Sequence, residues 1–357
     1  MLGTAPNPEF WNGRSVLLTG HTGFKGAWAL LWLHAMGARV TGFSLPPDTD
    51  PAMVDQIGGE SLCRSHLGDL RDLGAVERVV AESKPDIVLH MAAQPIVRRS
   101  IADPLETLAV NIQGTAHLLD AVRRLAKPQA VLVVTSDKVY SNDDQGRPFG
   151  EDDRLGGKDP YSASKAAAEL ITYSYGRTYF DALGIPWATA RCGNIVGGGD
   201  YSVDRIVPDA VRAAAAGQPL VLRHPEATRP WLHVIDGVAG YFVFAERLVQ
   251  DPATAPKALN FGPGEGPPLP VSDVASMMLE ALEASVPWRH EPVPGSVEMK
   301  ALAVDSALAR KTLGWRDRIT GQDRMIWSAQ WYKAARDGAD LRAVSLAQIE
   351  AYGALGA

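Results

Sequence analysis

Short runs of apolar, mostly β-branched residues recur in the first half of the chain and alternate with longer segments of helical periodicity. Such a run is typical of a strand that is buried on both faces of a parallel sheet. The runs predict six strands, at 15–18, 38–44, 86–90, 131–134 and 187–191, and one that ends at Leu67. Because strands and helices alternate, we expect an α/β fold with a doubly wound parallel sheet and right-handed crossovers.

Three helices are predicted between these strands. Residues 27–36 are rich in Ala, Leu and Trp. A longer helix at 104–126 begins at Asp103-Pro104, since proline is favoured in a first helical turn. A third helix is expected at 161–181.

A glycine-rich loop joins the first strand to the first helix, with the sequence Thr-Gly-His-Thr-Gly-Phe-Lys-Gly at 19–26. Gly20 allows a tight turn, Gly23 lets the backbone approach a pyrophosphate, and Gly26 lets the helix pack close to the strand. The helix N-terminus, at Phe24 and Lys25, offers backbone N–H groups to an anion. The loop therefore predicts a Rossmann-type dinucleotide site, the alternative being a purely structural glycine turn.

The rest of a dinucleotide site is less well defined. Residues 43–47 contain neither the acid that binds a ribose 2′-hydroxyl nor an arginine for a 2′-phosphate, so the residues leave NAD and NADP open. Asp69 is placed to bind an adenine amino group or, alternatively, to cap the following helix. The cofactor-binding residues that we expect are Gly20, Gly23, Phe24, Lys25, Gly26, Asp69, Leu70, Ala92, Ala93, Gln94, Tyr161 and Lys165.

From about Asn194 the predicted elements become shorter and more mixed, with more Pro and Gly. A chain of 357 residues is long enough for two lobes. We expect residues 1–193 and about 230–262 to form the dinucleotide-binding domain. Residues 194–229 and 263–357 would form a smaller mixed α/β lobe that binds the substrate.

Polar residues follow the strand at 131–134. Ser136, Asp137 and Lys138 lie at the carboxyl edge of the predicted sheet, where open α/β sheets bind their ligands. About twenty residues later, Tyr161 and Lys165 stand four apart and share one helix face, about 5–6 Å apart at Cβ. These five residues are the catalytic candidates.

Tyr161 and Lys165 suit proton transfer. An ammonium one turn away and the positive ring of nicotinamide both favour phenolate, which lowers the pKa of the phenol. Tyr161 can then take a proton from a sugar hydroxyl while hydride leaves the same carbon for the cofactor. Ser136 would hydrogen-bond that hydroxyl. The alternative for Tyr161 and Lys165 is a surface pair formed by chance.

Composition excludes several classes of protein. The net charge of −6 favours neither nucleic acid nor an anionic membrane surface as a partner. No apolar run approaches a membrane span, the first residues lack the features of a signal peptide, and the histidines show no metal-binding spacing. The two cysteines, Cys63 and Cys192, form no framework and suit a reducing cytoplasm.

Six stretches together resemble the extended short-chain dehydrogenase/reductase family over nearly the whole chain. They are TGHTGFKG (19–26), HMAAQPIVRRS (90–100), TSDKVY (135–140), LGGKDPYSASK (155–165), RCGNIVGGGD (191–200) and ATRPWLHV (227–234). Within that family the chain resembles the nucleotide-sugar 4,6-dehydratases, most closely those that act on CDP-glucose. The resemblance implies NAD as the cofactor, a nucleotide sugar as the small-molecule partner, and a homodimer formed through the long helices.

The resemblance also implies a reaction in three steps at one sugar. C4 is oxidised, water is lost across C5 and C6, and hydride returns to C6. Asp137 would protonate the departing C6 hydroxyl, which requires a pKa raised by burial. Lys138 stands where related dehydratases have a glutamate base, so it would take the C5 proton and needs a depressed pKa. Alternatively, Lys138 only orients the sugar or pairs with Asp137.

The diphosphate of the substrate would be held by backbone donors of Asn194 and the loop at 197–199. Arg229 resembles the family's phosphate-binding arginine, the alternative being a solvated surface charge. The substrate-binding residues that we expect are Ser136, Asn194, Gly198, Gly199, Arg205 and Arg229. Other functions stay open: a dehydratase that acts on a different nucleotide, an epimerase or decarboxylase of nucleotide sugars, and a non-catalytic dinucleotide sensor.

Overall fold

The computed structural model describes residues 5–264, 266, 268–293 and 299–355. Its centre is a seven-stranded, all-parallel sheet in the order β12-β7-β5-β4-β1-β2-β3. The strands are β1 (Ser15–Thr19), β2 (Arg39–Ser44), β3 (Arg64–Leu67), β4 (Ile87–His90), β5 (Ala130–Val134), β7 (Trp187–Cys192) and β12 (Ala258–Phe261). The order runs outward from β1 in both directions, so the sheet is doubly wound, as predicted.

Six of the seven strands lie within two residues of the predicted positions. The seventh, β12, was not expected as a strand. Its four residues Ala-Leu-Asn-Phe carry Asn260 in the middle, and they pair with β7 from Ala258↔Thr189 to Phe261↔Cys192. A four-residue run with a central amide lacks the apolar continuity that identifies a buried strand, so only the pairing reveals it.

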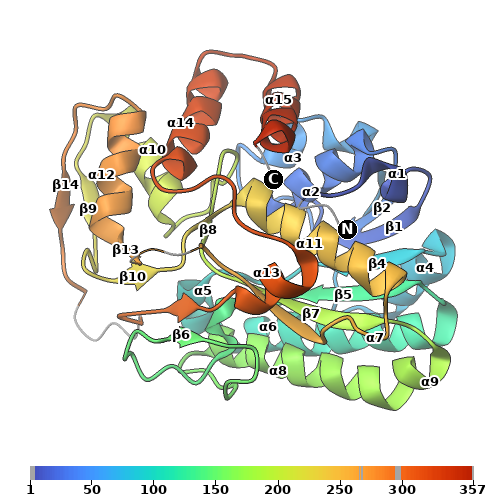
Figure 1. Ribbon diagram of the computed structural model, residues 1–357. Helices are drawn as coiled ribbons and strands as arrows, with labels where there is room; N and C mark the ends of the chain where they lie inside the picture. The colour runs from blue at the N-terminus through green and yellow to red at the C-terminus, as the bar shows by residue number, and fades with distance from the viewer. Residues whose placement is uncertain (1–4, 265, 267, 294–298, 356–357) are drawn as a thin grey trace.

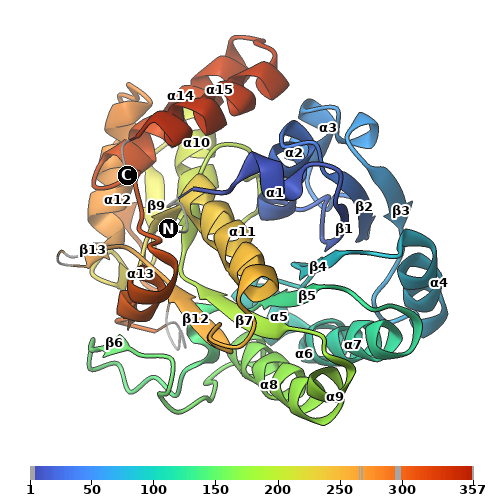
Figure 2. The ribbon, with the colours of Figure 1, turned by 45° about the vertical axis from the view of Figure 1, so that its right-hand side comes forward.

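Side chains alternate between the two faces of the sheet and so build two separate cores. Val16 and Leu18 of β1 join a cluster with helices α2 (Phe24–Ala35) and α11 (Val234–Gln250). Leu17 between them joins a second cluster on the opposite face. That face is covered by helices α4 (Leu73–Ser83), α7 (Gly114–Leu125) and α8 (Pro160–Tyr175). Figures 1 and 2 show α11 on one side of the strands and α7 and α8 on the other.

The two long predicted helices are present, and each contains a π-helical turn. The first runs through α6 (Pro104–Leu108), η2 (Ala109–Gln113) and α7, and the second through α8, η4 (Gly176–Phe180) and α9 (Asp181–Leu183). Asn111 lies in the first π turn, where its Oδ1 accepts from Gln94 N at 2.8 Å. The insertion turns a buried amide toward the loop after β4, a contact that helical periodicity does not predict.

The remaining elements extend beyond the carboxyl ends of the strands. Helices α10 (Ile206–Ala216) and α12 (Val271–Ala281) pack together beside the parallel pair β9 (Leu220–Leu222) and β14 (Trp288–His290). Helix α14 (Asp323–Arg336) contacts α12, whereas α15 (Leu341–Ala354) returns to α2.

In the described residues no helix combines the length and apolar character needed to cross a membrane. The short elements are α1 (Pro8–Trp11), α3 (Met53–Gln56), η1 (Gly59–Ser61), α5 (Val97–Ala102), η3 (Asp137–Val139), β6 (Pro148–Phe149), β8 (Ile195–Val196), β10 (Thr228–Arg229), β11 (Leu232–His233), β13 (Leu269–Pro270), β15 (Ala303–Val304) and α13 (Ala307–Leu313).

Candidate active site

A cavity of about 260 Å³ opens at the carboxyl ends of β5 and β7, bounded on its far side by α10 and β9. Residues from widely separated parts of the chain line it, from Lys25 to Met299. Eight residues that the sequence predicted for catalysis or binding lie together in its wall: Lys25, Ser136, Asp137, Lys138, Tyr161, Asn194, Arg205 and Arg229. Tertiary structure thus brings the predicted residues from both halves of the chain to one place.

The end of β5 positions the first three catalytic candidates. Strand β5 stops at Val134, and Ser136 caps the short helix η3 by accepting from Lys138 N at 3.2 Å. Ser136 Oγ also donates to Asp137 Oδ1 at 3.0 Å. Asp137 Oδ2 is buried and has no hydrogen-bond partner among the described residues. Burial raises the pKa of Asp137, and nearby Lys138 opposes the shift.

Helix α8 positions the other two catalytic candidates, Tyr161 and Lys165. Asp159 caps it, accepting from Ser162 N at 2.9 Å and from Ser162 Oγ at 2.6 Å, and Pro160 occupies its first turn. Tyr161 N donates to Ser100 Oγ at 3.1 Å, which ties the helix start to α5. These contacts bring Tyr161 to the cavity wall.

Tyr161 and Lys165 lie in the geometry that their spacing predicted, at the end of β5. The Tyr161 hydroxyl lies near the Ser136 hydroxyl in the cavity wall. One turn along the same helix, Lys165 Nζ donates to Val134 O at 3.3 Å and is buried. A surface pair formed by chance is excluded, because Tyr161 is only 8% exposed and Lys165 6%.

The electrostatics of this pair differ from expectation in one respect. Burial raises the pKa of Tyr161 to about 12, and the neighbouring Ser136 hydroxyl offsets the shift only in part. Burial and the charge of Lys25 lower the pKa of Lys165 to about 7. In the chain by itself, desolvation therefore outweighs the stabilisation of phenolate that an ammonium one turn away was expected to provide.

Two arginines bring positive charge to the cavity. Arg205 Nη1 pairs with Asp200 Oδ2 at 2.9 Å. Arg229 donates from Nη1 to Thr228 O at 2.8 Å and is 6% exposed, so it is not a solvated surface charge. Among the described residues no group of His, Cys, Asp and Glu could hold a metal ion.

The glycine-rich loop has the close contacts that its sequence predicted. Gly20 has φ +79°, and a Cβ there would lie 2.8 Å from the Ala92 backbone. A Cβ on Gly26 would lie 1.9 Å from Gly20 O. Gly23 caps α2 without a side-chain hydrogen bond, so no side chain of the cap residue occupies the N–H groups at the start of the helix.

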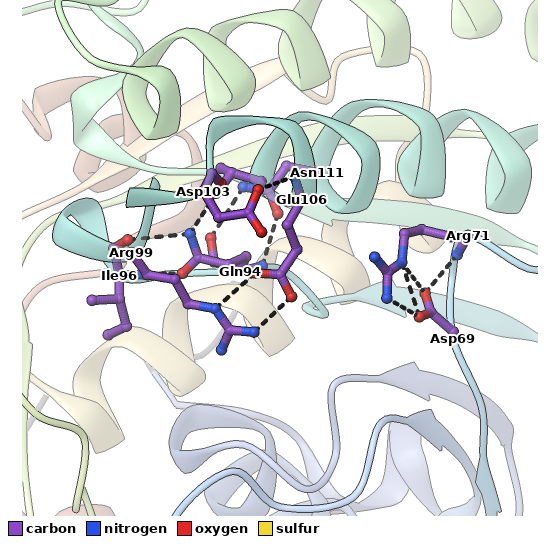
Figure 3. A network of polar contacts seen from close by, with 9 residues as sticks. Asp69, Arg71, Gln94, Ile96, Arg99, Asp103, Glu106 and Asn111 are labelled. Atoms are coloured by element: carbon purple, nitrogen blue, oxygen red, sulfur yellow. Dashed lines mark hydrogen bonds and ion pairs between the residues drawn. The ribbon is translucent and has the colours of Figure 1, made fainter. Parts of the chain in front are cut away.

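Asp69 does not cap the helix that follows it. The cap of α4 is Asp72, whose Oδ1 accepts from Ala75 N at 3.1 Å. Asp69 instead binds Arg71, accepting from its backbone N at 2.8 Å and from its Nε at 2.9 Å (Figure 3). The capping alternative is therefore wrong, because the turn at 69–72 places the next acid at the helix start. Leu70 is buried, and its carbonyl accepts from His117.

Gln94 has its polar atoms paired within the protein. Its Nε2 donates to Thr107 Oγ1 at 2.7 Å and to Ile96 O at 3.1 Å, and its Oε1 accepts from Ile96 N (Figure 3). The side chain thus holds the loop after β4 in shape. Ala92 N donates to Thr19 Oγ1 at 3.1 Å, and Ala93 lies next to it in the same loop, at the edge of the sheet where β1 ends.

Gly198 and Gly199 lie outside the wall of the cavity, which differs from the sequence prediction. A Cβ on Gly198 would lie 2.1 Å from Trp331, and Gly199 has φ +85° against Met53. Trp28 Nε1 donates to Gly198 O at 2.9 Å. Close packing of this loop on α2 and α14 explains why glycine occupies both positions. Trp28 is a core residue.

Comparison with known proteins identifies the family. The model of the family described as "NAD dependent epimerase/dehydratase family" matches residues 16–262, well over half of the chain. The chain belongs to this family. A CDP-glucose 4,6-dehydratase of Salmonella typhimurium is 37% identical over 349 residues, which cover 96% of this chain and 97% of the relative.

More distant members of the family are similar in sequence and structure. A dTDP-glucose 4,6-dehydratase of Xanthomonas campestris pv. campestris is 28% identical, covering 88% of this chain and 92% of the relative. The crystal structure of DesIV, a dTDP-glucose 4,6-dehydratase of Streptomyces venezuelae with NAD bound, has a TM-score of 0.77 at 25% identity. It covers 92% of this chain and 99% of DesIV.

The residues of the glycine-rich loop fit the cofactor that the family name implies. The contact between Gly20 and Ala92 leaves no room for a side chain, and the first turn of α2 has backbone donors without side-chain caps. This arrangement suits the pyrophosphate of NAD.

Three charged residues at the cavity were not predicted from the sequence. Arg98 and Arg223 both pair with Asp204 Oδ1, at 2.7 and 3.0 Å. Arg98 belongs to the loop-and-helix segment after β4, whereas Asp204 comes from beyond residue 200, so their ion pair joins two distant parts of the cavity lining. The two adjacent arginines in HMAAQPIVRRS indicate that basic residues follow β4. The sequence does not indicate which acid they pair with.

We predict that Gly20→Ala weakens NAD binding by roughly tenfold or more, since the added methyl displaces the loop from Ala92 and moves its N–H donors. The dissociation constant can be measured by calorimetry on protein freed of cofactor. Gly13→Ala is the matched control, because Gly13 has φ +75° but nothing within 4 Å of an added Cβ. Equal NAD affinity in Gly20→Ala and the unchanged protein would contradict the prediction.

Proposed function

We propose that this protein is a nucleotide-sugar 4,6-dehydratase that converts CDP-glucose to CDP-4-dehydro-6-deoxyglucose. The observation that carries the proposal is Asp137, a buried carboxyl in the cavity wall with a raised pKa and an Oδ2 atom without a partner in the described chain. Such a group can stay protonated and give its proton to a leaving hydroxyl. An epimerase expels no water and has no use for this acid.

The first step is oxidation at C4. NAD, when bound, supplies the reversible acceptance of hydride, so no external oxidant is consumed. Tyr161 Oη takes the proton of the C4 hydroxyl, and the neighbouring Ser136 orients that hydroxyl. Lys165, held against Val134 O, stabilises the phenolate when it is charged.

The second step is loss of water across C5 and C6. The C4 ketone acidifies the C5 proton, which Lys138 takes in its neutral form. Asp137 gives its proton to the C6 hydroxyl, which leaves as water. In the third step hydride returns to C6 and Lys138 returns its proton to C5. Tyr161 releases the proton that it took from the C4 hydroxyl, and Asp137 regains the proton that it gave to the leaving hydroxyl, so the net change is loss of one water.

The basic residues of the cavity wall support a nucleoside diphosphate as the ligand. Arg205, Arg229 and Asn194 face the cavity from the part of the chain beyond β7. We assign residues 194–229 and 263–357 to nucleotide-sugar binding and the remainder to NAD. The choice of cytidine is supported by the relative from Salmonella typhimurium, which carries CDP-glucose in its name.

Incubation with CDP-glucose, dTDP-glucose, UDP-glucose and GDP-mannose tests the reaction and the nucleotide together. We expect mass spectrometry to show loss of one water from CDP-glucose without added oxidant. Loss of water from another member alone would retain the mechanism and contradict the nucleotide assignment. No mass change with any of the four nucleotide sugars, in protein shown to contain NAD, would contradict the dehydratase proposal.

The acid and base roles can be separated in deuterium oxide. We expect Asp137→Asn to lower water loss by about 10²–10⁴-fold, because the leaving hydroxyl has no proton donor. Since Lys138 is intact in that variant, recovered CDP-glucose should carry deuterium at C5. Lys138→Met should lack both product and C5 deuterium, as measured by NMR of the recovered sugar.

Asp152→Asn serves as control, because Asp152 is exposed in the loop before α8. It should turn over as the unchanged protein does. Deuterium at C5 in the Lys138→Met reaction would mean that Lys138 orients the sugar and another group is the base.

We also propose a homodimer formed through α6 and α8. Leu105 is 76% exposed, and Leu170 and Tyr173, one turn apart on α8, are 60% and 57% exposed. Helices α6 and α8 pack together, and exposed apolar side chains that gather on neighbouring elements are typical of an interface. The two free thiols, Cys63 and Cys192, support a reducing cytoplasm as the compartment, which fractionation of the source cells would check.

Light scattering should therefore give twice the chain mass. Leu170→Lys combined with Tyr173→Lys should shift it to the monomer, because two buried ammonium groups would oppose association. Val203→Lys is the control, since Val203 is 64% exposed elsewhere. A monomeric unchanged protein, or a double variant that stays dimeric, would refute this interface.

A further inference from the structure

Glu169 is a buried anion that the reaction described above does not use. It lies on α8, one turn beyond Lys165 and two turns beyond Tyr161, and its side chain is 4% exposed. An ionised carboxyl at such depth is costly unless its oxygens are paired. The groups that pair with the Glu169 carboxylate therefore indicate its role in the protein.

Three donors surround the Glu169 carboxylate. Oε2 accepts from Thr189 Oγ1 at 2.7 Å and from Arg191 Nη2 at 2.8 Å, both on β7, and Oε1 accepts from Thr135 Oγ1. Thr135 directly precedes Ser136. The carboxylate thus joins the helix of Tyr161 and Lys165 to the ends of two sheet strands.

Arg191 is held in turn on its far side. Its Nη1 donates to Tyr140 Oη at 2.9 Å and to Glu151 O at 2.8 Å. The guanidinium therefore cannot swing away from Glu169 without losing several bonds. These contacts fix the Glu169 carboxylate, a negative charge that Arg191 balances, one turn along α8 from Lys165.

Lys165 needs such a charge, because its surroundings oppose its ionised form. Lys25 of α2 and His90 of β4 both interact with it electrostatically, and Glu169, paired with Arg191 of β7, lies on its own helix. His90 is neutral, since burial lowers its pKa to about 3. Burial and Lys25 lower the pKa of Lys165 to about 7, and Glu169 acts in the opposite direction.

We propose that Glu169 is a positioning residue that keeps the Lys165 ammonium charged beside Tyr161. It touches neither sugar nor cofactor and acts only through Lys165. The inference deepens the proposed function, because a charged Lys165 is what stabilises the phenolate that takes the C4 proton.

The test is the titration of Lys165 in cofactor-free protein, followed by NMR of ¹³C-labelled lysine and assigned with Lys165→Arg. Removing the Glu169 charge in Glu169→Gln should lower the pKa of Lys165 by about one unit or more from about 7. The ammonium would then be lost at lower pH, and turnover should fall roughly tenfold at pH 8 but much less at pH 6. KM should change little.

Thr189→Val is the matched control, because it removes one donor of the carboxylate and keeps the charge. Its Lys165 titration should equal that of the unchanged protein. A purely structural role predicts a different result: both variants would be less stable, and Lys165 would titrate as before in both. That outcome overturns the inference.

Glu169→Gln leaves Arg191 as an unpaired buried charge and so risks misfolding. The double variant Glu169→Gln, Arg191→Met removes both charges and is judged by the same titration. A lowered pKa of Lys165 supports the inference, and an unchanged one rejects it. The NMR measurement needs no substrate, so its result stands apart from whether any sugar is dehydrated.

Discussion

Desolvation at the carboxyl ends of β5 and β7 is the constraint on which this site depends. The same physical cause acts on three neighbouring groups with opposite consequences for acids and bases. It raises the pKa of Asp137, raises that of Tyr161 to about 12, and lowers that of Lys165 to about 7. Burial thus leaves a carboxyl that can donate a proton and an amine whose charge depends on its neighbours.

Buried polar side chains provide what water would otherwise supply to the strand ends. Glu169 and Arg191 form hydrogen bonds at the ends of β5 and β7, while Asn111 and Gln94 form them at the loop after β4. Asn111 Nδ2 also donates to Ser164 Oγ at 2.9 Å, so the π turn of one long helix contacts the helix of Tyr161. Each catalytic element is therefore supported by an amide or carboxylate from another, and the supports are buried together with it.

Much of the fold and part of the site follow from local sequence. The apolar runs and the glycines at 20 and 26 encode buried strands and a close helix-to-strand contact, because both depend on neighbours within a few residues. The four-residue spacing of Tyr161 and Lys165 places them on one helix face in any helical context. Pairing and packing with distant segments are not encoded this way. Strand β12, the π turns, the contacts of Gly198 and Gly199, and the helix cap at Asp72 rather than Asp69 required the structure.

The sequence by itself determined which residue types meet at the carboxyl edge of the sheet, since parallel strands bring their ends to one side. Only the tertiary structure determined whether these side chains are charged. The field at Lys165 comes from Lys25 and Glu169, which lie on two elements and are 144 positions apart in sequence. Coulomb energies and desolvation depend on distance and burial in space, so no spacing along the chain reports them.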